Sequence, residues 1–211
     1  MKKVAIIGIG NVGSALGKGL AAKGHTVTYG LRDPKSDKAK AALSKIGPNA
    51  KAATVPDAAA ASEVIILATP WSAAKEALQS AGNLSGKILV DCINPFTPDL
   101  KSLSLGTTTS AAETIASWAI GAQVVKAFNT TGADNMTHPS FGNQRLTMFI
   151  CGNDANAKKT VSSLAQDIGF DPVDAGALAE ARALEPLALL WVHLAVLQKM
   201  GSGIALQLIR R

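Results

Sequence analysis

The sequence has few of the residues that build metal centres, disulfide frameworks or catalytic dyads. It contains two cysteines and three histidines among 211 residues, and they are scattered along the chain. Cys92 and Cys151 each lie in or beside an apolar run, so we expect buried thiols in a reducing compartment. Because no cysteine–histidine cluster is present, the sequence predicts no metal site.

Long apolar runs and blocks of like charge are also lacking. The longest apolar stretch, "LALLWVHLAVL", is well short of the ~20 residues that a membrane-spanning helix needs. Glycines interrupt "MKKVAIIGIGNVG" before a secretory hydrophobic region develops, so no signal peptide is expected. The net charge of +6 comes without a lysine or arginine block, which argues against nucleic acid and fits a ligand carrying phosphates or carboxylates. We therefore expect a cytoplasmic protein with no membrane or nucleic-acid partner.

What the sequence does contain is a regular alternation of β-branched runs and alanine- and lysine-rich segments. Several of the latter end in a glycine placed to close a helix, at Gly24, Gly47, Gly82 and Gly169. The strands are predicted at residues 3–9, 26–30, 63–69, 87–93, 122–128, 145–151 and 171–175. Strands that alternate with helices form parallel sheets covered on both faces. The sequence thus predicts an α/β fold with a doubly wound, mostly parallel sheet of the Rossmann type.

Two segments depart from this alternation. Residues 94–109 form a long polar connection that leaves the carboxyl end of a strand, where such sheets bind ligands, and a helix restarts with capping-box spacing at Ser110 and Glu113. The C-terminal segment is apolar on nearly every face from Leu187 through Leu197. We therefore expect a nucleotide-binding domain over residues 1–175 and a helical segment over 176–211 that packs a homodimer.

The stretch "IGIGNVGSALGKG" predicts a dinucleotide site. Gly8, Gly10 and Gly13 follow a predicted strand and open an alanine-rich helix, which is the context that this fingerprint requires. Gly8 permits the sharp turn, Gly10 lets a pyrophosphate approach the backbone, and Gly13 allows close helix–strand packing. The amides of Asn11 and Val12 then face the phosphates from the helix N-terminus.

The end of the second predicted strand favours NADP over NAD. An NAD enzyme would place an acid there for the ribose hydroxyls, but this chain has Gly30, followed by Arg32 and Lys35. Without a carboxylate at this position, a 2′-phosphate meets no like-charge repulsion, and the cations supply its counter-charge. Asp33 leaves an alternative open, in which it pairs with Arg32 on a solvated loop.

The nicotinamide end is predicted at two further strand ends. Thr69, Pro70 and Trp71 follow one strand, and Asn129 and Thr130 end "VVKAFNT". Proline and aromatic groups can wall the ring, while an asparagine can fix its carboxamide. These strand ends offer no Ser/Tyr/Lys set, histidine base or metal cluster, so we expect no catalytic side chain and hydride transfer by positioning alone.

Across nearly its whole length the sequence resembles the F420:NADP oxidoreductases and their bacterial relatives, through the glycine motif, "ATPW", "TSAAE", "VVKAFNT", "CGND" and "DAGALAEARALEPLALLW". It is also similar to the reductase domain of the STEAP metalloreductases. The resemblance implies a dimeric Rossmann protein that moves a hydride between NADPH and a small-molecule acceptor, either coenzyme F420 or a flavin such as FMN or FAD. The cofactor-binding residues predicted from the motifs and this resemblance are Gly8, Ile9, Gly10, Asn11, Val12, Gly13, Arg32, Lys35, Ala68, Thr69, Pro70, Asn129, Thr130 and Ala133.

Two other functions stay open at this stage. One is an imine or hydroxyacid reductase, although those families add a large helical domain and too little chain follows Gly169 for one. The other is an NADPH-sensing module without turnover. A nicotinamide face plugged by Trp71 or Phe96 would favour the sensor, and an open cleft would favour an enzyme.

Overall fold

The computed structural model describes residues 1–44 and 46–211, and its centre is an eight-stranded sheet with the order β10-β9-β6-β5-β4-β1-β2-β3. Two short strands, β7 and β8, pair separately as a hairpin. The strands are β1 (Lys3–Ile7), β2 (Thr26–Leu31), β3 (Ala50–Thr54), β4 (Val64–Leu67), β5 (Ile88–Asp91), β6 (Gln123–Lys126), β7 (Ser140–Phe141), β8 (Gln144–Arg145), β9 (Thr147–Gly152) and β10 (Asp171–Gly176).

The sheet is parallel over most of its width. From β3 to β6 every neighbouring pair is parallel, β9 runs antiparallel to β6, and β10 pairs parallel with β9. β1, β2 and β4 run parallel, so their carboxyl ends lie at one edge of the sheet, and the chain reverses its winding between β1 and β4. This arrangement confirms the predicted doubly wound, mostly parallel fold.

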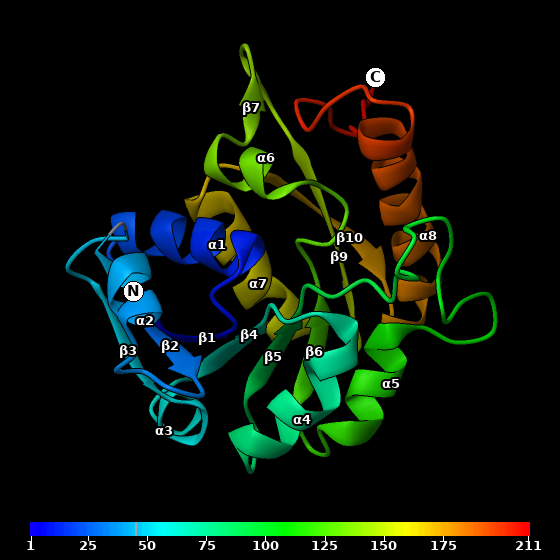
Figure 1. Ribbon diagram of the computed structural model, residues 1–211. Coiled ribbons are helices and arrows are strands. Elements are labelled where there is room, and N and C mark those ends of the chain that lie inside the picture. Colours follow the sequence, from blue (N-terminus) through cyan, green and yellow to red (C-terminus); the bar gives the residue numbers. More distant parts are fainter. Residues whose placement is uncertain (45) are drawn as a thin grey trace.

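Helices cover both faces of the sheet (Figure 1), with α1, α6 and α7 packed on one face and α3, α4, α5 and α8 on the other. The helices are α1 (Asn11–Ala22), α2 (Asp37–Leu43), α3 (Val55–Ala60), α4 (Trp71–Ala81), α5 (Ala111–Trp118), α6 (Ala133–Thr137), α7 (Ala155–Asp167) and α8 (Ala181–Val192), with a 3₁₀ turn η1 (Leu178–Glu180) and a π-helical segment η2 (His193–Leu197).

The sequence of β1 explains why both faces must be covered. Val4 and Ile6 belong to the apolar cluster under α1 and α7, whereas Ala5 and Ile7 belong to the cluster under α3, α4 and α5. Successive side chains of a strand point to opposite faces, so a strand without polar positions is stable only between two layers. All four of the glycines expected to close helices have positive φ angles. Gly24, Gly82 and Gly169 lie within two residues of the ends of α1, α4 and α7, as predicted, whereas Gly47 lies four residues beyond the last residue of α2.

β3 and the β7–β8 hairpin were not predicted from the sequence. β3 has the sequence "AKAAT", in which neither β-branched enrichment nor alternation signals a strand, and it forms an edge by pairing parallel with β2. Its backbone hydrogen bonds to β2 decide its conformation, which is why local propensity does not reveal it.

The long connection over residues 94–109 is held by a bridge within the loop and by a contact with η2. Phe96 and Leu103 form an antiparallel bridge within it, and the His193 ring Nε2 lies 3.2 Å from the carbonyl oxygen of Lys101, which ties the loop to η2. The predicted capping at the next helix is present, because Ser110 accepts a hydrogen bond from the Glu113 amide at the start of α5. The loop thus stands beside α8 at the carboxyl edge of the sheet (Figure 1).

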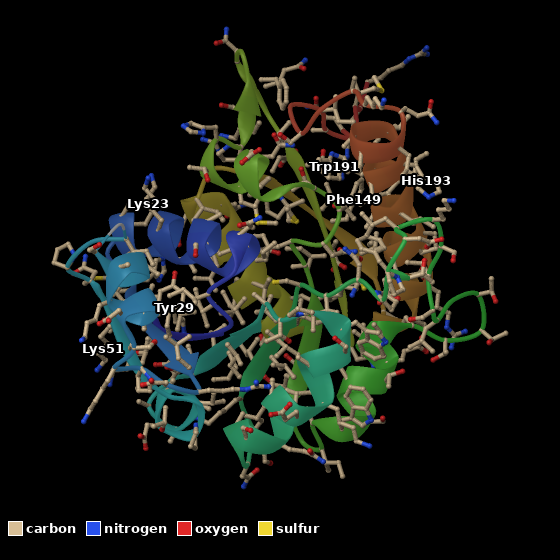
Figure 2. The ribbon with its side chains drawn as sticks, viewed as in Figure 1. Lys23, Tyr29, Lys51, Phe149, Trp191 and His193 are labelled. Atoms are coloured by element: carbon tan, nitrogen blue, oxygen red, sulfur yellow. The ribbon has the colours of Figure 1, made fainter. Side chains whose placement is uncertain are left out.

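The C-terminal segment returns across the same edge. The carbonyl oxygen of Ile204 accepts hydrogen bonds from Trp191 Nε1 and from Asn135 Nδ2, each at 2.8 Å, so the tail is fastened to both α8 and α6. Figure 2 shows Trp191 and His193 on the α8 side of the molecule, remote from Tyr29 near the N-terminal strands. Within the described residues, no helix is both long and apolar enough to cross a bilayer.

Candidate functional site

The turn between β1 and α1 has the geometry that its glycines predict. Gly8 has φ +109°, and a Cβ there would overlap the carbonyl oxygen of Ala68. Both the backbone conformation and the packing therefore disfavour a side chain at this position. A Cβ at Gly13 would overlap the Gly8 carbonyl oxygen, which shows how closely α1 packs on this turn. Tyr29 Oη donates a 3.0 Å hydrogen bond to the Gly13 carbonyl and holds the first turn of α1 from beneath.

Gly10 differs from its two neighbours in the motif. Its φ is −74°, which any residue can adopt, and a Cβ built on it would meet no atom within 4 Å. Neither backbone strain nor packing therefore requires glycine at this position. Asn11 and Val12 follow as the first residues of α1, where amides have no partner within the helix. The open space over Gly10, next to these amides, is the kind of cradle in which a phosphate can lie.

A cavity of about 490 Å³ opens beside this turn at the carboxyl ends of β1 and β2. Gly8 and Ile9 lie at one end, Gly30, Leu31 and Arg32 come from the end of β2, and α4 closes the far side. The full lining is Ile7, Gly8, Ile9, Gly30, Leu31, Arg32, Asp33, Ser36, Ala39, Val55, Thr69, Pro70, Ala73, Glu76, Ala77 and Ser80. The packing at Gly30 is tight, because a Cβ there would lie 3.1 Å from Val55 Cα.

Arg32 points into this cavity region but does not pair with Asp33, the partner considered from the sequence. Its Nη2 instead contacts both carboxylate oxygens of Glu76 on α4, each at 2.9 Å. The Asp33 carboxylate accepts a 3.0 Å hydrogen bond from the Lys35 amide within its own turn. Lys35 is exposed and is not among the residues that line the cavity, so the structure brings together Arg32 and the glycine turn but not Lys35.

A second cavity of about 250 Å³ continues from the glycine turn toward β4 and β5. It contains six of the residues predicted to bind the cofactor, together with one residue that sequence reasoning did not place there, Cys92. Its lining is Gly10, Asn11, Val12, Ala68, Thr69, Pro70 and Cys92. Thr69 Oγ1 is buried without a hydrogen-bond partner in the described part of the chain, and such an atom normally has one. A polar ligand group in this cavity would supply the missing partner.

The end of β6 lies near this region but is covered by protein. Asn129 and Thr130 are buried, and Asn129 Nδ2 donates to Asn94 Oδ1 at 3.0 Å and to the Leu184 carbonyl at 3.1 Å. Like Thr69 Oγ1, Asn129 Oδ1 is buried and has no hydrogen-bond partner among the described residues. Ala133 lines a different hollow of about 530 Å³ between α1 and α6. The structure therefore unites Ala68, Thr69 and Pro70 in one cavity and leaves Asn129, Thr130 and Ala133 outside its lining.

A buried ionic network behind these residues was not foreseen. Lys126 Nζ, fully buried, lies 2.7 Å from Asp91 Oδ2, 2.9 Å from Glu185 Oε1 and 2.6 Å from the Ile93 carbonyl oxygen. Burial by itself would lower the pKa of Lys126, but the two carboxylates outweigh burial and raise the pKa, so the lysine stays charged. The Glu185 carboxylate also accepts hydrogen bonds from two amides at the start of α5, where the helix dipole favours an anion.

The network joins two motifs that are far apart in the sequence. Lys126 belongs to "VVKAFNT" and Glu185 to "ALEPLALLW", and their contact fastens α8 to the ends of β5 and β6. A lysine, an aspartate and a glutamate inside otherwise apolar runs are the signal that could have revealed it, because buried charges are usually paired. The sequence alone could not identify which of them meet.

Both cysteines are buried and unbridged, in agreement with the sequence analysis. Burial is the main cause that raises the pKa of the Cys151 thiol to about 12, and it also raises the pKa of Cys92. The Cys92 thiol therefore presents a neutral, apolar wall to the smaller cavity.

Comparison with known proteins identifies the relatives of this arrangement. Residues 3–95 match the family described as NADP oxidoreductase coenzyme F420-dependent. The chain is 30% identical to the F420-dependent NADP reductase of Methanocaldococcus jannaschii over 220 residues, covering 96% of both chains. It is 36% identical over 189 residues to rat metalloreductase STEAP3, of which it spans 36% of the length.

Solved structures agree with this relation. A candidate F420-dependent NADP-reductase from Arthrobacter sp. FB24 superposes with a TM-score of 0.90 at 32% identity, covering 100% of both chains. An imine reductase from Myxococcus stipitatus matches at 22% identity with a TM-score of 0.67, covering 94% of this chain and 63% of that one, which shows a shared fold alone. The resemblance found in the motifs is thus confirmed, and the chain belongs to the family of coenzyme F420-dependent NADP oxidoreductases.

Proposed function

We propose that this protein transfers a hydride between NADPH and a flavin-like acceptor, coenzyme F420 or a flavin. The observation that carries the proposal is the open space over Gly10, a glycine that neither backbone nor packing requires, beside the two cavities at the carboxyl edge of the sheet. Ligands of doubly wound sheets bind at this edge, where the strand order reverses.

The residues of the two cavities fit the parts of a bound dinucleotide. Gly10 and the amides of Asn11 and Val12 would receive the pyrophosphate, and Arg32 would receive the 2′-phosphate. In the smaller cavity, Thr69 and Pro70 would face the nicotinamide, and Thr69 Oγ1 would gain the partner that it lacks. NADPH, when bound, supplies the hydride.

The protein's own contribution would be to hold the reacting rings in position. Among the described residues that line the two cavities there is no histidine, lysine or tyrosine to serve as a proton donor. Cys92 is present, but burial raises its pKa, which makes the thiol a poor proton donor and leaves it as a packing residue. Transfer of a hydride to another redox ring needs mainly proximity and alignment, which rigid strand ends and the α1 N-terminus can provide.

The proposal is preferred to a sensor without turnover for a specific reason. Trp71 stacks on Trp118 of α5, with ring centroids 5.3 Å apart, and does not line either cavity. Phe96 is held in its bridge with Leu103 and is also outside both linings. Neither aromatic residue therefore plugs the place proposed for the nicotinamide.

The test is stopped-flow oxidation of NADPH, measured at 340 nm, against F420, FMN, FAD and riboflavin in parallel. We expect rapid oxidation with one deazaflavin or flavin and slow oxidation with the others. Binding of NADPH without oxidation by any of the four would favour the sensor. Turnover with an imine or a carbonyl compound instead would replace the acceptor that we propose.

We further propose that residues 176–211 serve as a dimerisation segment and that the protein is a homodimer. Side chains of α8, η2 and the following tail leave apolar surface exposed, with Leu190 48%, Val196 51% and Met200 59% accessible. A second copy of this segment is the simplest cover for such a patch.

Replacing Val196 or Met200 by glutamate should convert the dimer to a monomer, because each change places a charge in the proposed contact. Light scattering coupled to gel filtration measures the mass. Ile120→Glu is the matched control, since Ile120 is 82% exposed in the turn after α5, and this change should leave the mass unchanged. A wild-type protein that elutes as a monomer would contradict the proposed dimer.

A further inference from the structure

The ion pair between Arg32 and Glu76 lies at the end of the cavity proposed for the adenosine ribose. NADPH and NADH differ there, because NADPH has a 2′-phosphate and NADH a 2′-hydroxyl. Both residues line the larger cavity, and both are accessible, with 79% and 64% of their side chains exposed. Arg32 follows the last residue of β2, and Glu76 lies on the face of α4 that also contributes the small residues Ala73 and Ala77. A ligand that enters this end of the cavity therefore meets a cation and a carboxylate that already bind each other.

Glu76 brings a carboxylate to the end of the cavity where β2 lacks the acid that an NAD enzyme has. Gly30 occupies the position of that acid, and the Asp33 carboxylate is engaged by the Lys35 amide. Among the described residues of the lining, Arg32 is the only cation, and Glu76 holds it with two 2.9 Å contacts. A 2′-phosphate has to compete with this carboxylate for the guanidinium fork. A ribose 2′-hydroxyl can instead donate a hydrogen bond to Glu76.

We propose that Glu76 is a specificity-determining residue that weakens NADPH binding, supports NADH binding and so narrows the preference of the site for NADPH. The inference rests on the proposed function, because it assumes that the cavity receives the adenosine end of the nucleotide. It adds a residue from α4, on the opposite wall from the glycine turn, to the determinants of cofactor choice. Glu76 acts on the phosphate through Arg32 and by direct repulsion.

The decisive variant is Glu76→Gln, which keeps the size of the side chain and removes its charge. NADPH should bind about two- to fivefold more tightly, which is the range set by release of an exposed ion pair. NADH should bind about two- to tenfold more weakly, because the glutamine is a poorer acceptor for ribose hydroxyls. Isothermal titration of the full chain with each nucleotide, at one fixed ionic strength, measures both constants.

Two further variants separate the contributions. Glu63→Gln, at an exposed ion pair with Lys2 on another part of the surface, makes the same change of net charge and should alter neither constant. Arg32→Ala should weaken NADPH selectively, and in this background Glu76→Gln should lose most of its effect on NADPH. Thermal unfolding of each variant should match the wild type, because all three side chains are exposed.

The outcomes distinguish this inference from the proposed function. If wild-type protein binds neither nucleotide, the proposed function fails and the inference fails with it. If wild-type protein binds NADPH but the Glu76→Gln variant binds it no more tightly, the proposed function stands and the role of Glu76 is wrong. The same holds if the variant binds NADPH and NADH more tightly by the same factor. Tighter binding of NADPH together with weaker binding of NADH by Glu76→Gln supports both the proposed function and the role of Glu76.

Discussion

Replacing Lys126 by methionine is expected to lower the free energy of unfolding by about 3–5 kcal/mol, the range observed when one partner of a buried ion pair is removed. Methionine matches the length of lysine but leaves the Asp91 and Glu185 carboxylates facing each other without a cation. Both carboxylates are almost fully buried, so water cannot replace the lost ammonium. Urea denaturation followed by circular dichroism measures the loss.

Two companion variants show whether charge or packing is responsible. Adding Glu185→Gln to Lys126→Met should restore part of the stability, because it removes one of the uncompensated charges while keeping an acceptor for the α5 amides. Lys2→Met is the matched surface control, since the pair of Lys2 with Glu63 is exposed and should contribute less than about 1 kcal/mol. A Lys126→Met protein as stable as the Lys2→Met variant would show that the network is not a stabilising feature.

Replacing Gly10 by valine is expected to weaken NADPH binding strongly while leaving the fold intact. The side chain would occupy the open space in which we propose that the pyrophosphate lies. Loss of two charge-assisted hydrogen bonds, at about 1.5–3 kcal/mol each, weakens binding on the order of 10²–10⁴-fold. Because a Cβ at this position meets no atom within 4 Å and φ is ordinary, the free energy of unfolding should change by less than about 1 kcal/mol.

Substitutions at two other glycines serve as controls for this prediction. Gly8→Ala should destabilise the protein, because φ is +109° there and the new Cβ overlaps the Ala68 carbonyl oxygen. Gly106→Val, at another glycine with open surroundings, should change neither stability nor binding. Titration calorimetry and thermal unfolding measure the two properties. Unchanged NADPH affinity in Gly10→Val would contradict the pyrophosphate site and, with it, the proposed function.

The fold class and the glycine turn could be predicted because local constraints determine them. Apolar runs without polar positions require a doubly covered sheet, and Gly8 occupies a φ that other residues rarely adopt. The placement of Arg32 just beyond β2 follows from the same strand pattern. By contrast, β3 has no signal in its own residues, and only pairing with β2 makes it a strand.

The sequence by itself determined the fold class, most of the strands and helices, and the glycine turn after β1, since hydrophobic periodicity and backbone conformation act over a few neighbouring residues. Only the tertiary structure decided which charges meet. It paired Arg32 with Glu76 instead of the adjacent Asp33, and Lys126 with Glu185 of the C-terminal helix. Such partners are chosen by the packing of whole helices on the sheet, because an ion pair forms wherever the fold brings opposite charges within reach, whatever their separation along the chain.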